Sequence, residues 1–160
     1  SEEDVRSAYQ AMMERVRSAQ PSARIHGALV QQMARPGREV IVGVKVDPDF
    51  GPILMVGLGG VHVEVLNDVA FAPVPLSDED ALDSLQRLEG IKLLHGFRNE
   101  PASDIRALID LMVRVSRFAA DFADQLEELE LNPVLVHPSG EGLTIVDALI
   151  VTRSPAAERA

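Results

Sequence analysis

The sequence predicts an α+β fold in which helices flank an antiparallel sheet. Helical periodicity is strong at residues 3–19 and 101–122. Runs rich in β-branched residues lie between and after these two segments, and turns containing Pro and Gly bound each run. The strand segments follow one another without regular alternation with helices, which favours this class over a doubly wound α/β sheet.

The first third of the chain is expected to form one helix and then strands. Residues 3–19 place apolar side chains at i, i+3 and i+4 spacing, and acidic residues follow Ser1, as at a helix N-terminus. A tight turn at residues 35–38 lies between two of the strands expected to pair antiparallel. Strands are expected at residues 27–33, 39–46 and 53–56.

The second part of the chain is expected to add helices and a closing hairpin. Ser77 and the acidic residues after it predict a cap for a helix that runs to about Leu88. The helix at residues 101–122 has the strongest periodic pattern. Strands are expected at residues 68–74, 128–137 and 142–151, the last two around a turn at 138–141. We expect one domain over residues 1–152 and a frayed tail over 153–160.

Composition narrows the classes of function. The chain of 160 residues has a formal charge of −10 and contains only two lysines, Lys45 and Lys92, so a nucleic-acid-binding surface is not expected. No apolar run approaches the roughly 20 residues that span a bilayer, and the acidic start does not resemble a signal or transit peptide. With no cysteine, disulfides and thiolate-bound metals are excluded, and a cytoplasmic location is expected.

The closing hairpin brings hard oxygen ligands together. If its turn is centred on Ser139-Gly140, Asn132 lies directly opposite Asp147, with Cβ atoms about 4.5–5.5 Å apart. Glu130 lies two residues back on the same face, opposite Leu149. Carboxylate and amide oxygens are the ligands that magnesium prefers, and a substrate phosphate usually completes the shell.

The pattern of the hairpin leaves two readings open. The face with these oxygens also fits a solvated surface, and Asn132-Pro133 also fits a local bend. The opposite face is expected to belong to the core, through the apolar residues Leu129, Leu131, Leu135, Val146, Ala148 and Ile150.

Three segments resemble the ATP-grasp region of NDP-forming acyl-CoA synthetases: residues 39–52, residues 57–64 (Gly-Leu-Gly-Gly-Val-His-Val-Glu) and residues 128–133 (Glu-Leu-Glu-Leu-Asn-Pro). Residues 93–98 are similar too, and the resemblance runs from the first helix to about Ile150. It implies the C-terminal part of an ATP-grasp domain that binds ATP and Mg²⁺. The family converts an acid, CoA and ATP into acyl-CoA, ADP and phosphate through an acyl phosphate and a phosphohistidine.

The final hairpin is more distantly similar to that of the succinyl-CoA synthetase β chain. This resemblance implies that Asn132 and Asp147 bind Mg²⁺ and that Glu130 orients the phosphohistidine. The strand register and the resemblance therefore select the same pair of ligands. The phosphorylated histidine itself is not expected to be His62, His95 or His137, because the family carries it in other segments.

The resemblance also implies nucleotide contacts. The interdomain hinge that reads the adenine edge falls on four residues, Val30, Gln31, Gln32 and Met33, for which a plain buried strand is the alternative. Glu39 is implied to meet the nucleotide or to fix the hinge, the alternative being a surface ion pair. Close approach to phosphate is implied for Gly57, Gly59 and Gly60, where positive φ is available, with Glu64 ending the motif; a bulge or tight turn is the alternative.

The resemblance implies partners as well. In the family, a cationic ATP-grasp half precedes this region, and CoA-binding and ligase domains complete the enzyme. We therefore expect a fragment of a longer protein, inactive alone, whose apolar helix faces dock neighbouring domains or a second copy in a homo-oligomer.

Two positions depart from the family pattern. Ala72 and Leu149 stand where the pattern has arginine. They favour, as an alternative function, a degenerate and non-catalytic ATP-grasp module with a regulatory or scaffolding role, such as one in a bacterial acyltransferase fusion.

Overall fold

The structure is a computed structural model that describes residues 1–59, 68–96 and 100–153. Two compact units make up the chain, Ser1–Met33 and Ala34–Ala160. None of the helices in the described ranges has an apolar stretch that would let it cross a bilayer.

The first unit contains helix α1 (Glu2–Ala19), as the periodicity predicts. Ser1 caps it: the Ser1 Oγ accepts from the Asp4 amide at 3.3 Å and donates to the Asp4 carboxylate at 2.7 Å. No residue of α1 is buried in the described structure. Its apolar stripe, Val5, Tyr9, Met12 and Val16, is exposed.

The strand predicted at residues 27–33 is wrong. The segment is extended but belongs to no strand, and Leu29, Val30 and Met33 are 82%, 85% and 89% exposed. A β-prone sequence forms a strand only where a neighbouring strand hydrogen-bonds to its N–H and C=O groups. No such neighbour is present within the described residues.

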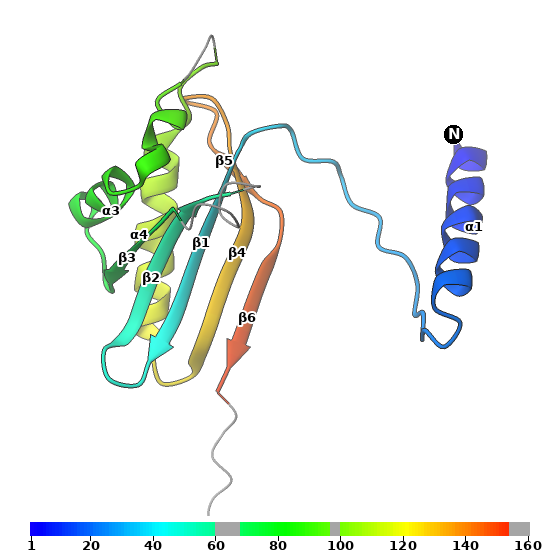
Figure 1. The fold of residues 1–160 in the computed structure, drawn as a ribbon, viewed down its shortest axis with the longest axis horizontal. Helices are drawn as coiled ribbons and strands as arrows, with labels where there is room; N and C mark the ends of the chain where they lie inside the picture. The colour runs from blue at the N-terminus through cyan, green and yellow to red at the C-terminus, as the bar shows by residue number, and fades with distance from the viewer. Residues whose placement is uncertain (60–67, 97–99, 154–160) are drawn as a thin grey trace, which may run out of the picture. The chain divides into compact units, whose positions relative to one another are not determined.

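The second unit is built on an antiparallel sheet of six strands in the order β3-β2-β1-β4-β5, with β6 also paired to β4 (Figure 1). The predicted α+β class is confirmed. The strands are β1 (Arg38–Asp47), β2 (Gly51–Leu58), β3 (Val69–Pro73), β4 (Leu126–Val136), β5 (Leu143–Ile145) and β6 (Ala148–Thr152).

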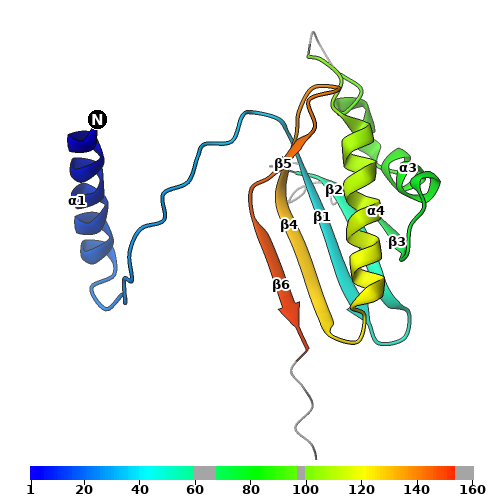
Figure 2. The same ribbon diagram turned by 180° about the vertical axis from the view of Figure 1, so that it is seen from behind.

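Helices cover one face of the sheet (Figure 2). They are α3 (Asp78–Gln86), capped by Ser77 as predicted, the short 3₁₀ helix η1 (Glu89–Leu93), and α4 (Ile105–Asp121), which is capped by Asp104. Between helices and strands lies an apolar core whose fully buried members include Val42, Leu54, Leu85, Leu108 and Met112. The opposite face of the sheet carries no helix of this unit in the described ranges, and we call it the open face.

The prediction that Val146, Ala148 and Ile150 belong to the core is wrong. All three are exposed, because the helices of this unit do not cover the edge formed by β6 and the residues just before it.

On β4 the alternation of buried and exposed side chains shifts by one residue. A bulge between the pairs Val40–Val134 and Val42–Leu131 inserts one residue into β4. Leu129 and Leu131 are therefore buried as predicted, but Val134 and Val136 are buried in place of Leu135.

Candidate nucleotide and magnesium site

The hairpin register is the one predicted from the sequence. Glu130 pairs with Leu149, and Leu131 pairs with Ala148. One step further, the Asn132 amide donates to the Asp147 carbonyl at 3.2 Å. Asn132 of β4 and Asp147, the residue before β6, therefore lie next to each other at the end of the β4–β6 ladder.

The polar atoms around Asn132 are arranged as a set. The Asn132 Nδ2 donates to the Glu130 Oε1 at 2.9 Å. This bond turns the amide oxygen of Asn132 away from Glu130, and no described residue donates to that oxygen. The Asp147 Oδ1 accepts from the Ala148 amide at 2.8 Å, which leaves Oδ2 without a donor among the described residues.

The type and the number of these two oxygen ligands suit magnesium. Mg²⁺ usually takes one or two protein oxygen ligands and completes its octahedron with water and substrate phosphates. Among the described residues no group of three His, Cys, Asp or Glu side chains could hold a metal without such help. The donor set thus suits a nucleotide-bridged cation better than a closed structural metal site.

A groove of about 340 Å³ lies on the open face beside this pair. Gly43 of β1 lies in its middle, with Met55 of β2 and Glu130 of β4 as its register partners on either side. We call it the open-face groove. Its lining consists of Ile41, Gly43, Val44, Lys45, Asp47, Ile53, Met55, Phe71, Glu128, Leu129 and Glu130.

Gly57 and Gly59 lie where neighbouring residues leave too little space for a side chain. The Gly59 amide donates to the Glu39 carbonyl at 2.6 Å, and a Cβ on Gly59 would lie 2.6 Å from the Glu39 Cβ. At Gly57 a Cβ would lie 2.9 Å from a methyl group of Val69. Neither glycine has the positive φ on which the expected phosphate contact depended. Gly60 and Glu64 lie outside the described residues.

The other implied nucleotide contacts stay predictions. Glu39 is exposed on β1, where its carbonyl bonds Gly59, and it forms no ion pair with any described residue. The implied hinge, Val30, Gln31, Gln32 and Met33, lies in the first unit and is exposed, so the alternative of a buried strand is wrong.

The two departures from the family pattern differ in position. Ala72 is buried on the helix-covered side of β3, so a missing arginine there does not change the open face. Leu149 is 52% exposed and lies opposite Glu130 on the open side of the ladder. Within the described residues Glu130 forms no ion pair, and its partner is the Asn132 amide.

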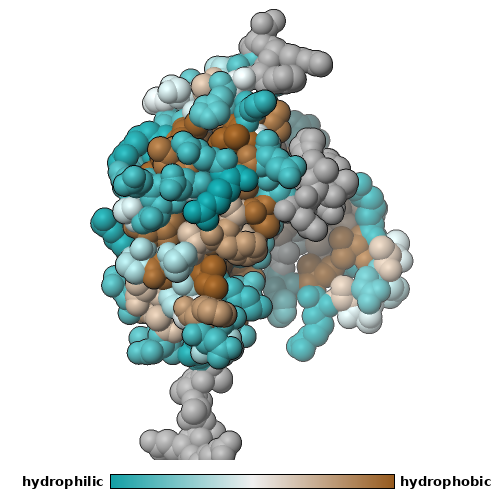
Figure 3. Space-filling model, turned by 60° about the vertical axis from the view of Figure 1, so that its left-hand side comes forward, coloured by the Kyte–Doolittle hydropathy of each residue, from teal (hydrophilic) through white to brown (hydrophobic). Residues whose placement is uncertain are grey.

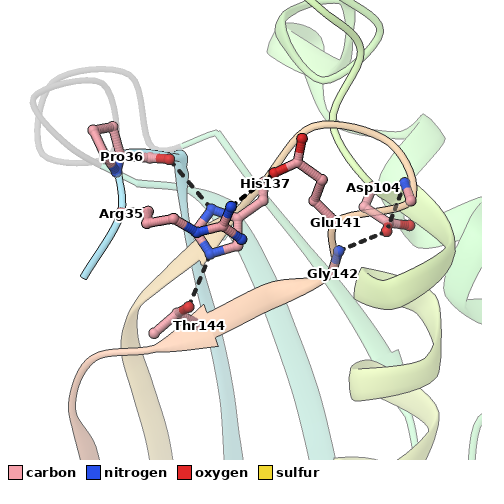
Figure 4. A network of polar contacts seen from close by, with 8 residues as sticks. Arg35, Pro36, Asp104, His137, Glu141, Gly142 and Thr144 are labelled. Carbon is pink, nitrogen blue, oxygen red and sulfur yellow. Dashed lines mark hydrogen bonds and ion pairs between the residues drawn. The ribbon is translucent and has the colours of Figure 1, made fainter.

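Sequence reasoning missed the contacts that anchor the hairpin turn (Figure 4). The Asp104 Oδ2 accepts from the backbone amides of Gly140 and Gly142 at 3.0 and 2.9 Å. The same carboxylate caps α4 through the Ala107 amide. The hydrogen bonds from Gly142 and Ala107 lower the pKa of Asp104, against an opposing effect of its burial. The sequence shows the cap, but the contact across 38 residues has no local signal.

His137 secures the other side of the turn. It is 2% exposed, and its Nε2 lies 2.8 Å from the Thr144 hydroxyl while its Nδ1 lies 3.2 Å from the Pro36 carbonyl. The Pro36 carbonyl can only accept, so the Nδ1 of His137 is the donor in that contact. Arg35 adds an ion pair to Glu141 at 2.9 Å. These contacts fix β4 and β5 to the start of β1.

Comparison with protein families gives a match to the ATP-grasp domain over residues 1–152. The chain belongs to the ATP-grasp family. This ATP-grasp chain is 40% identical over 153 residues to the β subunit of an ADP-forming acetate–CoA ligase (II) from Pyrococcus furiosus, a match covering 96% of the chain and 65% of the relative. It thus spans somewhat less than two thirds of that subunit. An ADP-forming acetate–CoA ligase from Archaeoglobus fulgidus is 43% identical, and the match covers only 20% of its length.

Solved structures agree with the ATP-grasp assignment. A crystal structure from Pyrococcus horikoshii is 40% identical, with a TM-score of 0.85, over 97% of this chain and 65% of that one. The acetyl-coenzyme A synthetase 1 of Ca. Korarchaeum cryptofilum, in complex with coenzyme A and Mg-AMPPCP, is 40% identical, with a TM-score of 0.80, over 96% of this chain and 65% of that one. In that structure a phosphohistidine segment points towards the nucleotide-binding site. The expected resemblance to NDP-forming acyl-CoA synthetases is confirmed.

Proposed function

We propose that this ATP-grasp chain supplies the magnesium–ATP half-site of an ADP-forming acid–CoA ligase. The reaction converts an acid, CoA and ATP into acyl-CoA, ADP and phosphate. One observation carries the proposal: Asn132 of β4 and Asp147, the residue before β6, lie side by side, each with an oxygen that no described residue engages. The named activities of the relatives and the Mg-AMPPCP in the Korarchaeum structure support it.

In this proposal Asn132 Oδ1 and Asp147 Oδ2 hold Mg²⁺, which when bound neutralises charge on the transferred phosphoryl group. Glu130, oriented by the Asn132 amide, faces the histidine that accepts the phosphoryl group. Nucleotide contacts of Val30–Met33, Glu39, Gly57, Gly59, Gly60 and Glu64 are implied by the family resemblance and belong to this proposal. Catalysis rests on positioning and charge neutralisation.

The proposal also concerns the rest of the enzyme. Because the chain spans 65% of the Pyrococcus furiosus subunit, we infer that further polypeptide completes the ATP-grasp domain and supplies CoA-binding and ligase domains. The chain alone then has no synthetase activity. A cytoplasmic location belongs to the same proposal.

Magnesium-dependent ATP binding tests the proposed function. Isothermal titration calorimetry is performed on the chain and on its fusion to the part of the Pyrococcus furiosus subunit outside the match. Asn132→Ala and Asp147→Ala should each weaken binding with Mg²⁺ at least ~tenfold and leave metal-free binding unchanged. Asp124→Ala, at an exposed turn, is the matched control. Equal affinities for all four proteins would refute the metal assignment.

A second candidate function is a non-catalytic module with a regulatory or scaffolding role, and one observation favours it. Leu149 faces Glu130, where the family pattern has an arginine that would pair with the carboxylate. Restoring the charge with Leu149→Arg separates the two functions. Under this second function, only the restored variant of the fusion binds Mg²⁺–ATP.

A further inference from the structure

Strand β6 lies at an edge of the sheet, and its sequence lacks the residues that usually protect such an edge. It pairs with β4 on one side, and no described residue pairs with it on the other (Figure 1). Its five residues, Ala-Leu-Ile-Val-Thr, include no charge and no proline. Leu149 and Ile150 are each 52% exposed. Natural edge strands usually carry charges or proline, because an unprotected edge pairs with a strand of another chain.

The free hydrogen-bonding groups of this edge follow from its ladder with β4. At its two ends, the Asp147 carbonyl and the Arg153 amide both bond backbone groups on the β4 side. Backbone groups alternate in direction along an antiparallel strand, so the N–H and C=O of Ala148, Ile150 and Thr152 point away from the sheet. The Ala148 amide is already bonded to the Asp147 carboxylate at 2.8 Å. The other outward groups are free to pair with a second strand.

The edge is complementary to itself. Two β6 strands that run antiparallel about a two-fold axis at Ile150 place that residue opposite its own copy, so that each Ile150 amide donates to the Ile150 carbonyl of the other copy. Thr152 then lies opposite Ala148, and its amide donates to the free Ala148 carbonyl. On the open face, Leu149 lies opposite Val151. A symmetric dimer requires such self-complementarity, because the same surface of both copies forms the interface.

The charges at the two ends of β6 select the same register. In it, Asp147 of one copy lies opposite Arg153 of the other, with Cβ atoms about 4.5–5.5 Å apart. Both side chains are exposed, and Arg153 forms no ion pair with any described residue. Opposite charges directly across two strands stabilise the pairing. A shift by two residues sets Asp147 opposite Val151 and loses the ion pair.

We propose that the β6 strands of two copies of this chain pair antiparallel about Ile150 and form one continuous sheet across a symmetric dimer. Arg153 of the second copy then brings a cation to Asp147, beside the proposed magnesium site. A carboxylate accepts at about four positions, so this contact and a bound metal do not exclude each other. The pairing itself involves neither nucleotide nor metal, so it does not depend on the proposed function.

Sedimentation velocity of the full chain, in EDTA and across the micromolar range, tests the dimer. The unsubstituted chain should pass from monomer to dimer as its concentration rises. Ile150→Lys should abolish the dimer, because like charges then meet at the two-fold axis. Leu82→Lys, at a partly exposed position of α3, is the matched control and should dimerise as the unsubstituted chain does.

An exchange of charges tests the register. Arg153→Asp should weaken the dimer about tenfold, because both cross-strand pairs become repulsive. Adding Asp147→Arg to this variant should restore most of the affinity. Arg117→Asp, on the exposed surface of α4, is the control and should leave the affinity unchanged.

Hydrogen exchange followed by NMR tests which backbone groups pair. The amides of Ile150 and Thr152 should exchange more slowly at high concentration than at low concentration. Those of Leu149 and Val151, which point at β4, should not change.

Three results overturn the proposal: a monomer at every concentration, a dimer that Ile150→Lys leaves unchanged, or slowed exchange only at amides outside β6. Failure of the proposed function is a different result, because it appears in the magnesium–ATP titrations and leaves the dimer measurements as they are.

Discussion

Gly59 is important to the fold because it has no side chain. Its amide bonds the Glu39 carbonyl at 2.6 Å, so the two backbones lie too close for a side chain. The requirement comes from backbone approach and not from an unusual φ. This contact joins the end of β2 to the start of β1, next to the residues that the family resemblance connects with nucleotide.

The substitution Gly59→Ala should therefore destabilise the fold. The added Cβ would lie 2.6–2.9 Å from Glu39 atoms, two of them in the backbone, and overpacking of this kind costs about 1–3 kcal/mol of unfolding free energy. Urea denaturation measures the change. Gly43→Ala is the control and should change the unfolding free energy by less than about 1 kcal/mol. Equal effects of the two substitutions would contradict the packing argument.

Asp104 gives a residue-scale prediction about pH. Its folded-state pKa is lowered, mainly by the Gly142 amide, so its contribution to stability is fully present above the unfolded pKa of about 3.9 and is lost as pH falls through the folded value. Asp104→Asn should cost about 1 kcal/mol at pH 6. The gap to the unsubstituted chain should narrow towards pH 3, as urea denaturation at both values would show. A gap independent of pH would contradict the role of the carboxylate charge.

At the scale of elements, Ser116 joins α4 to the segment that leads into α3. It is fully buried; its hydroxyl accepts from the Leu76 amide at 3.0 Å and donates to the Val113 carbonyl at 2.8 Å. The bond spans 40 residues and holds the helical layer together.

Ser116→Ala should leave the buried Leu76 amide without a partner and cost about 1–3 kcal/mol. Faster hydrogen exchange at the Leu76 amide, with a lower melting temperature, is the expected result. Ser18→Ala, on the exposed surface of α1, is the control. An unchanged exchange rate at Leu76 would show that the hydroxyl does not serve this amide.

The elements also show what the sequence could and could not predict. The pairing of Asn132 with Asp147 is confirmed, because a turn fixes the register of a hairpin and the register determines which residues face each other. Burial of Val146 and Ile150 was wrongly predicted, because register does not say whether a layer covers that face. The phase change at Val134 follows from a bulge against β1, a strand about 90 residues away in the chain.

Nonlocal contacts explain the other misses. The anchor from Asp104 to Gly142 depends on the whole fold to bring a helix cap to a hairpin turn. The segment at residues 27–33 has the sequence of a strand and lacks a described partner. In both cases the local sequence pattern is the expected one, a helix cap in the first and a strand-like sequence in the second. Whether the distant contact or the strand forms depends on which residues the rest of the fold places nearby.

At the scale of the whole molecule, the chain consists of two compact units, and the first unit ends in an extended segment. Residues 24–33 of that segment make no backbone hydrogen bond with any described residue. Hydrophobic patches lie between hydrophilic side chains on the surface shown in Figure 3.

Limited proteolysis should cut the first unit within its extended segment and release helix α1. Trypsin should cut first after Arg24, which is exposed in the extended segment, because an unpaired extended backbone fits a protease active site. The product that starts at Ile25 should keep the melting temperature of the sheet within about 2 °C, since the core lies within the second unit. Resistance at Arg24, or loss of the cooperative transition after cutting, would show that the first unit stabilises the second.

In the proposed function, Asn132 and Asp147 hold a divalent cation against a nucleotide. Paramagnetic Mn²⁺ with AMPPCP, in place of Mg²⁺, tests it most directly, because Mn²⁺ broadens NMR signals only near the metal. We expect broadening of the Asn132 side-chain amide and the Ala148 backbone amide, relieved by Asp147→Ala. Broadening centred elsewhere, or none with nucleotide present, would contradict it.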